Sequence, residues 1–189
     1  AKQLLRDAGL PVPPGRRASG VEEAVAIAEA VGFPVAVKAL GLAHKSEHGA
    51  VRLNLHGATA VANAARGLLS LGTGLMVERM IEGGTAELIV GVTRDAVFGP
   101  VMTIGFGGVL VELLKDSATV LLPTTASEVD TALRGLKMFP LLDGYRGRPK
   151  ADVDAAVRAI LGVADFALAH AERLAELDIN PLIVCEEGA

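Results

Sequence analysis

The sequence predicts an α/β (α+β) protein of two lobes, and three observations support this prediction. A chain of 189 residues is long enough to bury a substantial core. Hydrophobic residues make up 51% of it but aromatic residues only 3%, so the core must be built from Val, Leu, Ile and Ala, as in α/β proteins. Near residue 80, helices alternating with strands give way to a run of strands typical of a largely antiparallel sheet backed by helices. We therefore expect one lobe over residues 1–79 and a second over residues 80–189.

The first lobe is expected to begin with helices and to contain three strands. Ser19 and Glu22 have the spacing of a capping box at the start of a helix, and Gly32 lies just past the end of the apolar pattern. The expected elements are helix 4–8, connector 11–15, helix 21–31, strand 34–39, strand 50–55, helix 61–69 and strand 75–78.

The second lobe is expected to be mainly a sheet. Arg94 and Asp95 form a turn between two apolar strands, which predicts an antiparallel hairpin. The expected elements are strands 87–93, 98–104, 109–112 and 118–122, a short helix capped by Ser127, a long helix over 153–168, and two strand pieces within 174–184 that bend at Pro181.

Composition excludes several classes of protein. A formal net charge of −4 and no dense basic stripe argue against a nucleic-acid partner. No apolar run approaches the ~20 residues that span a bilayer, so we expect no membrane segment. The single cysteine, Cys185, excludes an internal disulfide and suits a cytoplasmic location. The chain starts without Met and within a helical pattern, so we expect it to be a piece of a longer protein.

Lys38 is the first candidate site residue. Val35, Val37 and Ala39 point to one side of the strand, so Lys38 points to the other and leads into a polar loop bounded by Gly41. A lysine at an edge strand commonly extends its amine to solvent. Lysines within apolar strands are uncommon, however, and we favour contact with a phosphate group.

His44, in that loop, has two interpretations that the residues alone leave open. A single loop histidine is usually only solvated, and we interpret His48, His56 and His170 in that way. If His44 is functional, it is a nucleophile or proton carrier rather than a metal ligand, because no second histidine lies at ligand spacing.

The remaining candidates lie in the second half of the chain. Residues 105–108 form a glycine-rich run between two strands, which permits either a bulge or close approach of backbone amides to a phosphate. Asp178 and Asn180 alternate on one face of a strand and offer two oxygen ligands that suit Mg²⁺, although turn residues ahead of Pro181 have the same composition. Glu78 and Glu87 are solvated strand-end charges unless a nucleotide lies nearby.

In order and spacing, these segments resemble the ATP-grasp domain of the ADP-forming acyl-CoA (acetyl-CoA) synthetase family, which is related to the succinyl-CoA synthetase β subunit. The resemblance extends over essentially the whole chain. The matching segments are 32–38, 44–51, 77–81, 87–91, 98–100, 105–109 with Glu112, and 176–182.

The resemblance implies a two-lobe fold that holds ATP between antiparallel sheets. It implies that Lys38 contacts the phosphates, that Glu78, Arg79, Met80 and Ile81 line the adenine, and that Glu87 binds the ribose. Gly107 and Gly108 would offer backbone amides to phosphate, Asp178 and Asn180 would hold Mg²⁺, and His44 would accept the phosphoryl group. The whole enzyme would convert acid, CoA and ATP into acyl-CoA, ADP and phosphate.

Two departures from the family pattern limit what this chain is expected to do. Ala50 stands where the family often has a second glycine, and the sequence ends before the strand that would carry a further metal-binding aspartate. The expected partners are the CoA-binding and CoA-ligase domains or a subunit that holds them, and an oligomer is compatible with the sequence. The main alternative is a nucleotide-binding regulatory or scaffold module of a fused protein acetyltransferase. A carboxylate–amine ligase of the same broad fold is disfavoured because it does not need His44.

Overall fold

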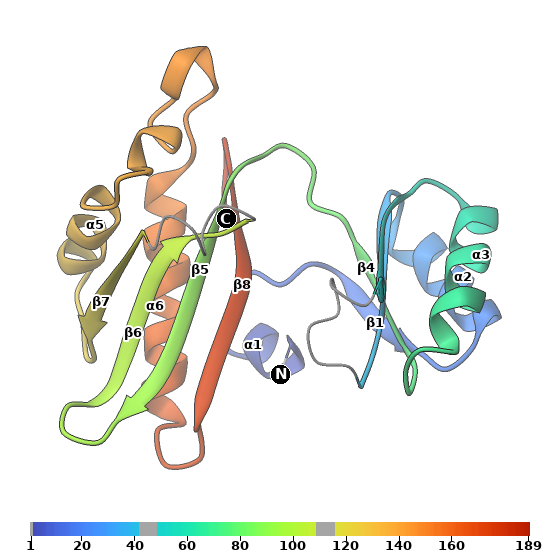
Figure 1. Ribbon diagram of the computed structural model, residues 1–189, viewed down its shortest axis with the longest axis horizontal. Helices are drawn as coiled ribbons and strands as arrows, with labels where there is room; N and C mark the ends of the chain where they lie inside the picture. Colours follow the sequence, from blue (N-terminus) through green and yellow to red (C-terminus); the bar gives the residue numbers. More distant parts are fainter. Residues whose placement is uncertain (1, 42–48, 109–115) are drawn as a thin grey trace. The chain divides into compact units, whose positions relative to one another are not determined.

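The computed structural model describes residues 2–41, 49–108 and 116–189. These residues form two compact units: Pro13–Glu82 is the smaller, and the segment before Pro13 joins Gly83–Ala189 to form the larger (Figure 1). This division differs in two ways from the expected boundary between residues 79 and 80. The linker after the last strand of the smaller unit extends to residue 82, and the N-terminal helix belongs to the larger unit.

The smaller unit is a four-stranded antiparallel sheet covered on one face by two helices (Figure 1). The strands lie in the order β1-β4-β2-β3, so β4 and β2 are central. Its core contains the buried valines and leucines of the central strands and the apolar faces of both helices. The elements are β1 (Gly15–Ala18), α2 (Val21–Val31), β2 (Val35–Ala39), β3 (Val51–Leu55), α3 (Ala58–Leu69) and β4 (Leu75–Arg79).

The start of α2 differs from the predicted capping box. The N-cap residue is Gly20, which has no side chain to accept a hydrogen bond. Ser19 instead donates from its backbone amide and its hydroxyl to the carboxylate of Glu23, at 2.8 Å each. The acceptor is therefore one residue later than Glu22. The predicted end of the helix is confirmed, because Gly32 has φ +84°, a conformation that favours glycine.

The larger unit is a second four-stranded antiparallel sheet, in the order β7-β6-β5-β8, with α5 and α6 packed on one face (Figure 1). Buried residues of β5, β6 and β8 form one core with these helices and with Leu5 and Leu10 from the N-terminal segment. The elements are α1 (Lys2–Asp7), β5 (Gly84–Asp95), β6 (Gly99–Phe106), β7 (Ser117–Leu121), α5 (Ala126–Arg134), the 3₁₀ turns η1 (Phe139–Leu141) and η2 (Tyr145–Gly147), α6 (Val153–Ala169) and β8 (Glu176–Cys185). The strand expected at 109–112 lies outside the described residues.

Helices α5 and α6 begin at residues with acceptor side chains. Thr125, not the predicted Ser127, is the N-cap of α5 and forms a full capping box with Glu128. The Thr125 hydroxyl and amide hydrogen bonds lower the pKa of the Glu128 carboxyl. Asp152 caps α6 by accepting from the amide of Ala155, and this bond, together with one from Gly188, lowers the pKa of Asp152.

The last strand is one continuous element rather than two pieces bent at Pro181. It pairs with β5 along its length, but the register shifts between two pairs, Leu88 with Leu182 and Val90 with Ile179. Two residues of β8 therefore oppose one of β5, which is a β-bulge at residues 180 and 181. The bulge reverses the alternation of side chains along β8. Before the bulge, odd-numbered residues pack against the core; after it, even-numbered residues do so.

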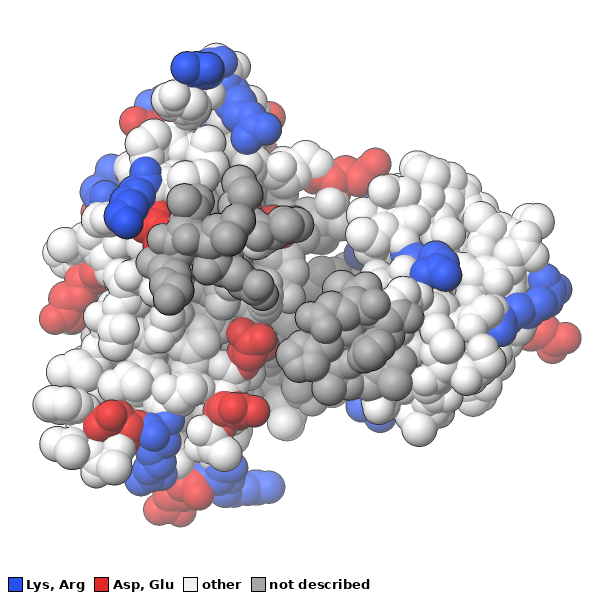
Figure 2. All heavy atoms as spheres, viewed as in Figure 1, with Lys and Arg blue, Asp and Glu red and all other residues white. Residues whose placement is uncertain are grey.

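Charged side chains are mixed in sign on the surface. In the view of Figure 2, Lys and Arg are interspersed with Asp and Glu on the visible face of the larger unit, among the side chains that the structure describes.

Candidate functional site

Lys38 lies on β2, a central strand of the smaller sheet, on the face opposite the helices. The neighbouring Val37 and Ala39 are fully buried in the core, whereas the side chain of Lys38 is 35% exposed. Its Nζ atom lies 3.0 Å from a carboxylate oxygen of Glu78 on β4, and only 5% of the Glu78 side chain is exposed. Lys38 and Glu78, which are 40 positions apart in the chain, therefore form an ion pair in which the carboxylate is buried.

Hydrogen bonds to other segments hold the backbone that follows Glu78. The amide of Arg79 donates to the carbonyl of Pro14, and the amide of Met80 donates to the carbonyl of Pro34, at 2.9 Å each. The Met80 sulfur accepts a hydrogen bond of 3.0 Å from the amide of Asn54. Ile81 is 37% exposed. Arg79 and Met80 are thus held by their backbone amides and by the Met80 sulfur, while the side chains of Arg79 and Ile81 are exposed.

Glu87 and Gly107 lie side by side in the larger unit. Glu87 is an exposed residue of β5, and the amide of Gly107 donates to its carbonyl oxygen at 2.7 Å. A Cβ at Gly107 would lie 3.2 Å from Cβ of Glu87, so the absence of a side chain permits this close approach. Gly108 is exposed and has φ +93°, which leaves the turn dependent on glycine.

Asp178 and Asn180 are both exposed on β8. Asp178 pairs with Gly91 of β5, and Glu87 pairs with Ile183 after the bulge. Because paired residues of antiparallel strands point to the same face, Glu87 and Asp178 lie on the face of the sheet that does not pack against α5 and α6. The Asp178 carboxylate and the Asn180 amide oxygen are ligand types that fit Mg²⁺, which completes its shell with water and phosphate oxygens.

Comparison with known proteins gives the family. The model of a family described as "ATP-grasp domain" matches residues 1–189. The chain belongs to the ATP-grasp family. The fold class and the family resemblance predicted from the sequence are thereby confirmed, with two antiparallel sheets backed by helices.

Among curated proteins, this ATP-grasp domain is 39% identical over 196 residues to "Acetate--CoA ligase [ADP-forming] I" of Archaeoglobus fulgidus, covering 98% of this chain and 28% of that protein. It is 34% identical over 200 residues to "Acetate--CoA ligase [ADP-forming] I subunit beta" of Pyrococcus furiosus, covering all of this chain and 85% of that subunit. The chain thus spans little more than a quarter of the first relative's length but most of the second's.

Among solved structures, the domain superposes with a TM-score of 0.93 on the "dinucleotide forming Acetyl-coenzyme A synthetase 1" of Ca. Korarchaeum cryptofilum in complex with coenzyme A, Ca-AMPCP and HgCl+. The two are 32% identical, over 100% of this chain and 86% of the other. A second structure of that protein, with a TM-score of 0.86 and 33% identity over 100% of this chain and 85% of the other, contains coenzyme A and Mg-AMPPCP. In that structure the phosphohistidine segment points towards the nucleotide binding site.

Two further charged residues, Asp116 and Arg146, make structural contacts. His44 and Glu112 lie outside the described residues. Asp116 is buried, and its carboxylate accepts hydrogen bonds from the amides of Lys137 and Met138, at 2.9 and 2.8 Å. Arg146 has φ +54° and lies over the ring of Tyr145 at 5.3 Å. Asp116 is thus a structural carboxylate that the sequence did not identify as such.

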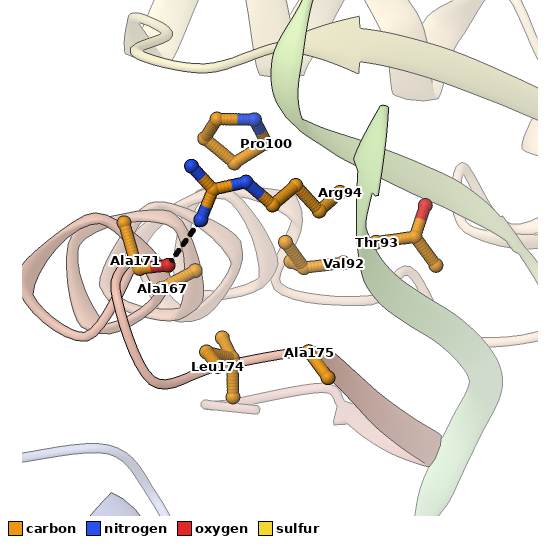
Figure 3. Close-up of a pocket in the computed structure, with 8 residues that line it drawn as sticks. All are labelled: Val92, Thr93, Arg94, Pro100, Ala167, Ala171, Leu174 and Ala175. Atoms are coloured by element: carbon orange, nitrogen blue, oxygen red, sulfur yellow. Dashed lines mark hydrogen bonds between the residues drawn. The ribbon is translucent and has the colours of Figure 1, made fainter. Parts of the chain in front are cut away.

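A small pocket of about 260 Å³ of empty volume, including its open mouth, lies at the far end of β5. Arg94 borders it and donates to the carbonyl oxygen of Ala171 at 2.8 Å (Figure 3). Arg94 lies seven positions after Glu87, about 23 Å along a strand that rises ~3.3 Å per residue. This pocket therefore does not belong to the candidate nucleotide site of the ATP-grasp domain. It is lined by Val92, Thr93, Arg94, Pro100, Ala167, Ala171, Leu174 and Ala175.

Within the described ranges, no three His, Cys, Asp or Glu side chains gather into a metal-binding group. The pair at Asp178 and Asn180 is compatible with this result, because Mg²⁺ commonly takes one or two protein oxygens and completes its shell with water and phosphate. No helix in the described part of the chain is long and apolar enough to cross a membrane.

Proposed function

We propose that this chain is the ATP-binding part of an ADP-forming acyl-CoA synthetase. The observation that supports it most directly is the similarity over the full length of the chain to a β subunit of an ADP-forming acetate–CoA ligase. The structural neighbour contains coenzyme A and a nucleotide analogue, which are ligands of the same reaction. The reaction interconverts acid, CoA and ATP with acyl-CoA, ADP and phosphate.

Each candidate residue has a role that its chemistry fits. The Lys38 amine contacts the phosphates as a point charge. Residues 78–81 line the adenine, and the exposed carboxylate of Glu87 accepts hydrogen bonds from the ribose hydroxyls. The amide of Gly108 would donate to a phosphate oxygen, whereas the amide of Gly107 already donates to the carbonyl oxygen of Glu87. Phosphoryl transfer depends mainly on such positioning and charge neutralisation.

Asp178 and Asn180 are proposed to hold Mg²⁺ through their side-chain oxygens. When bound, the ion neutralises charge on the phosphate oxygens. The carboxylate supplies the negative charge, and the amide oxygen supplies a second ligand without adding to the repulsion between protein and phosphate.

His44 is proposed as the phosphoryl acceptor. An imidazole nitrogen forms a bond to the γ-phosphorus of ATP while the bond to ADP breaks, ADP leaves with the electron pair, and the imidazole loses its N–H proton to solvent. A neutral imidazole has the required lone pair near pH 7. The phosphorylated residue then transfers the group to the acid substrate on the CoA-binding and CoA-ligase domains, which we propose as partners in the same chain or in a second subunit. A cytoplasmic location fits this substrate set and the single Cys185.

Calorimetric titration of the intact protein with Mg-ATP tests the binding proposal. The wild type is expected to bind, and Lys38→Met is expected to weaken binding about 10–150-fold, the range for loss of ~1.5–3 kcal/mol from a hydrogen bond to a charged group. Lys150→Met is the matched control, since Lys150 is exposed and pairs with Asp143. A wild type without affinity for Mg-ATP would refute the proposed function. Unchanged affinity in Lys38→Met would refute only the role of Lys38.

Labelling with [γ-³²P]ATP tests the histidine. The intact protein is expected to acquire an acid-labile, base-stable label that His44→Asn abolishes. A label that persists in this variant would exclude His44 as the acceptor.

A further inference from the structure

The buried carboxylate of Glu78 makes a contact that the assigned roles do not use. On the smaller sheet, Lys38 pairs with Met76 and Ala36 pairs with Glu78, so Glu78 is the diagonal neighbour of Lys38 on the same face. The two side chains meet at 3.0 Å, although the amine is one-third exposed and the carboxylate is almost fully buried. A long cationic side chain thus reaches from solvent towards a carboxylate fixed within the sheet.

A carboxylate with so little exposure requires compensation from a cation and hydrogen bonds, because burial removes its hydration. This asymmetry determines which partner orients the other. Glu78 is held by the surrounding strands, whereas the flexible Lys38 stem can adopt many rotamers in its absence. The carboxylate therefore limits the positions available to the amine.

Strand β1, which pairs with β4, leaves space for the Glu78 side chain. Gly15 on β1 pairs with Glu78. A Cβ at Gly15 would lie 2.6 Å from the carbonyl oxygen of Val77 and 2.8 Å from Cγ of Glu78, both closer than Cβ atoms approach in proteins. A side chain at this position would displace Glu78 or separate β1 from β4. Glycine is therefore required at this position by the backbone of β4 and by the Glu78 side chain together.

We infer that Glu78 is a positioning residue, whose carboxylate holds the Lys38 amine where it meets the nucleotide phosphates, and that Gly15 keeps this carboxylate in place. The inference rests on the proposed function. It assigns the Glu78 side chain to the lysine. Affinity for the nucleotide then depends on Glu78 and Gly15, although neither residue needs to touch the nucleotide.

The test measures Mg-ATP affinity of the intact protein in Glu78→Gln, Lys38→Met and the double variant. Partners that orient metal ligands change affinity about 10–100-fold when removed, and we expect an effect of about tenfold or more for Glu78→Gln by the same logic. Once Lys38 is absent, Glu78→Gln is expected to have no further effect. This non-additivity would not result from a merely structural role. The control is Glu29→Gln, an exposed carboxylate of the same unit.

Gly15→Ala provides a second test that keeps both charges. It is expected to weaken Mg-ATP binding to a similar extent, whereas Gly67→Ala, where an added Cβ meets nothing within 4 Å, is expected to bind as the wild type does. If Lys38→Met binds weakly while Glu78→Gln and Gly15→Ala bind as the wild type does, the positioning role is refuted and the proposed function stands. If Glu78→Gln weakens binding equally with and without Lys38, the role is also refuted. If the wild type does not bind Mg-ATP, the proposed function itself fails.

Discussion

Replacing Asp116 with alanine should destabilise the larger unit measurably. The carboxylate is 6% exposed and accepts hydrogen bonds from the amides of Lys137 and Met138, at 2.9 and 2.8 Å. These bonds join the start of β7 to the turn that follows α5. Alanine would leave both amides without their acceptor.

The magnitude follows from the exposure of the two donors. Lys137 is exposed, so water can replace the lost acceptor at its amide, whereas Met138 is partly buried. An unsatisfied buried donor costs about 1–3 kcal/mol, which places the expected loss near ~2 kcal/mol. In a protein of this size, each kcal/mol changes the melting temperature by roughly 2–4 °C, so a decrease of about 4–8 °C is expected.

Differential scanning calorimetry gives the melting temperature, and hydrogen exchange followed by NMR reports the amides of Lys137 and Met138 directly. Both amides should exchange faster in Asp116→Ala. Asp165→Asn, an exposed position on α6, is the matched control and should behave as the wild type. An Asp116→Ala protein with unchanged melting temperature and unchanged exchange at both amides would refute the reasoning.

Two further predictions concern helices. Gly67→Ala in α3 should stabilise the smaller unit by about 0.5–1 kcal/mol, because its Cβ meets nothing within 4 Å and alanine favours the helix. Gly162→Ala in α6 should not stabilise, because its Cβ would lie 2.9 Å from Leu10; equal denaturation midpoints for the two variants would contradict this contrast. Hydrogen bonds from the amides of Ala155 and Gly188 lower the pKa of Asp152 in the folded state. The stabilisation they give is therefore present at pH values above the ordinary aspartate pKa near 4, and it is lost as the pH falls through the lowered pKa. Thermal melts of wild type and Asp152→Asn should therefore differ at pH 7 and converge below about pH 4, and a constant difference would contradict the assignment.

Local patterns were sufficient to predict most of the elements. Alternating apolar residues gave β2 and the outward direction of Lys38, and positive φ at Gly32 agrees with the predicted end of α2. These signals depend on residues within one strand or one helical turn, which the sequence displays directly. The family resemblance added the prediction of two lobes with antiparallel sheets, which no local pattern contains.

The missed features are those that depend on distant partners. β1 contains two arginines in four residues and no apolar alternation, so only its pairing with β4 makes it a strand. The ion pair of Lys38 with Glu78 joins residues on different strands, and the sequence showed each only as a separate charge. The register shift at Asn180 depends on the pairing of β8 with β5, and in the sequence it resembled a bend at the following proline.

The smaller unit is an insertion within the larger one, because chain segments on both sides of Pro13–Glu82 belong to the same compact unit. Leu5 and Leu10 complete a core whose last strand is the C-terminal β8. During synthesis, the smaller unit has all its strands once residue 82 has left the ribosome, whereas the first residues of the chain must wait for the final ones before their own core can close. Helix α1 is therefore made before the other described elements and is among the last of them to find its place, so removal of α1 and removal of β8 should weaken the same unit.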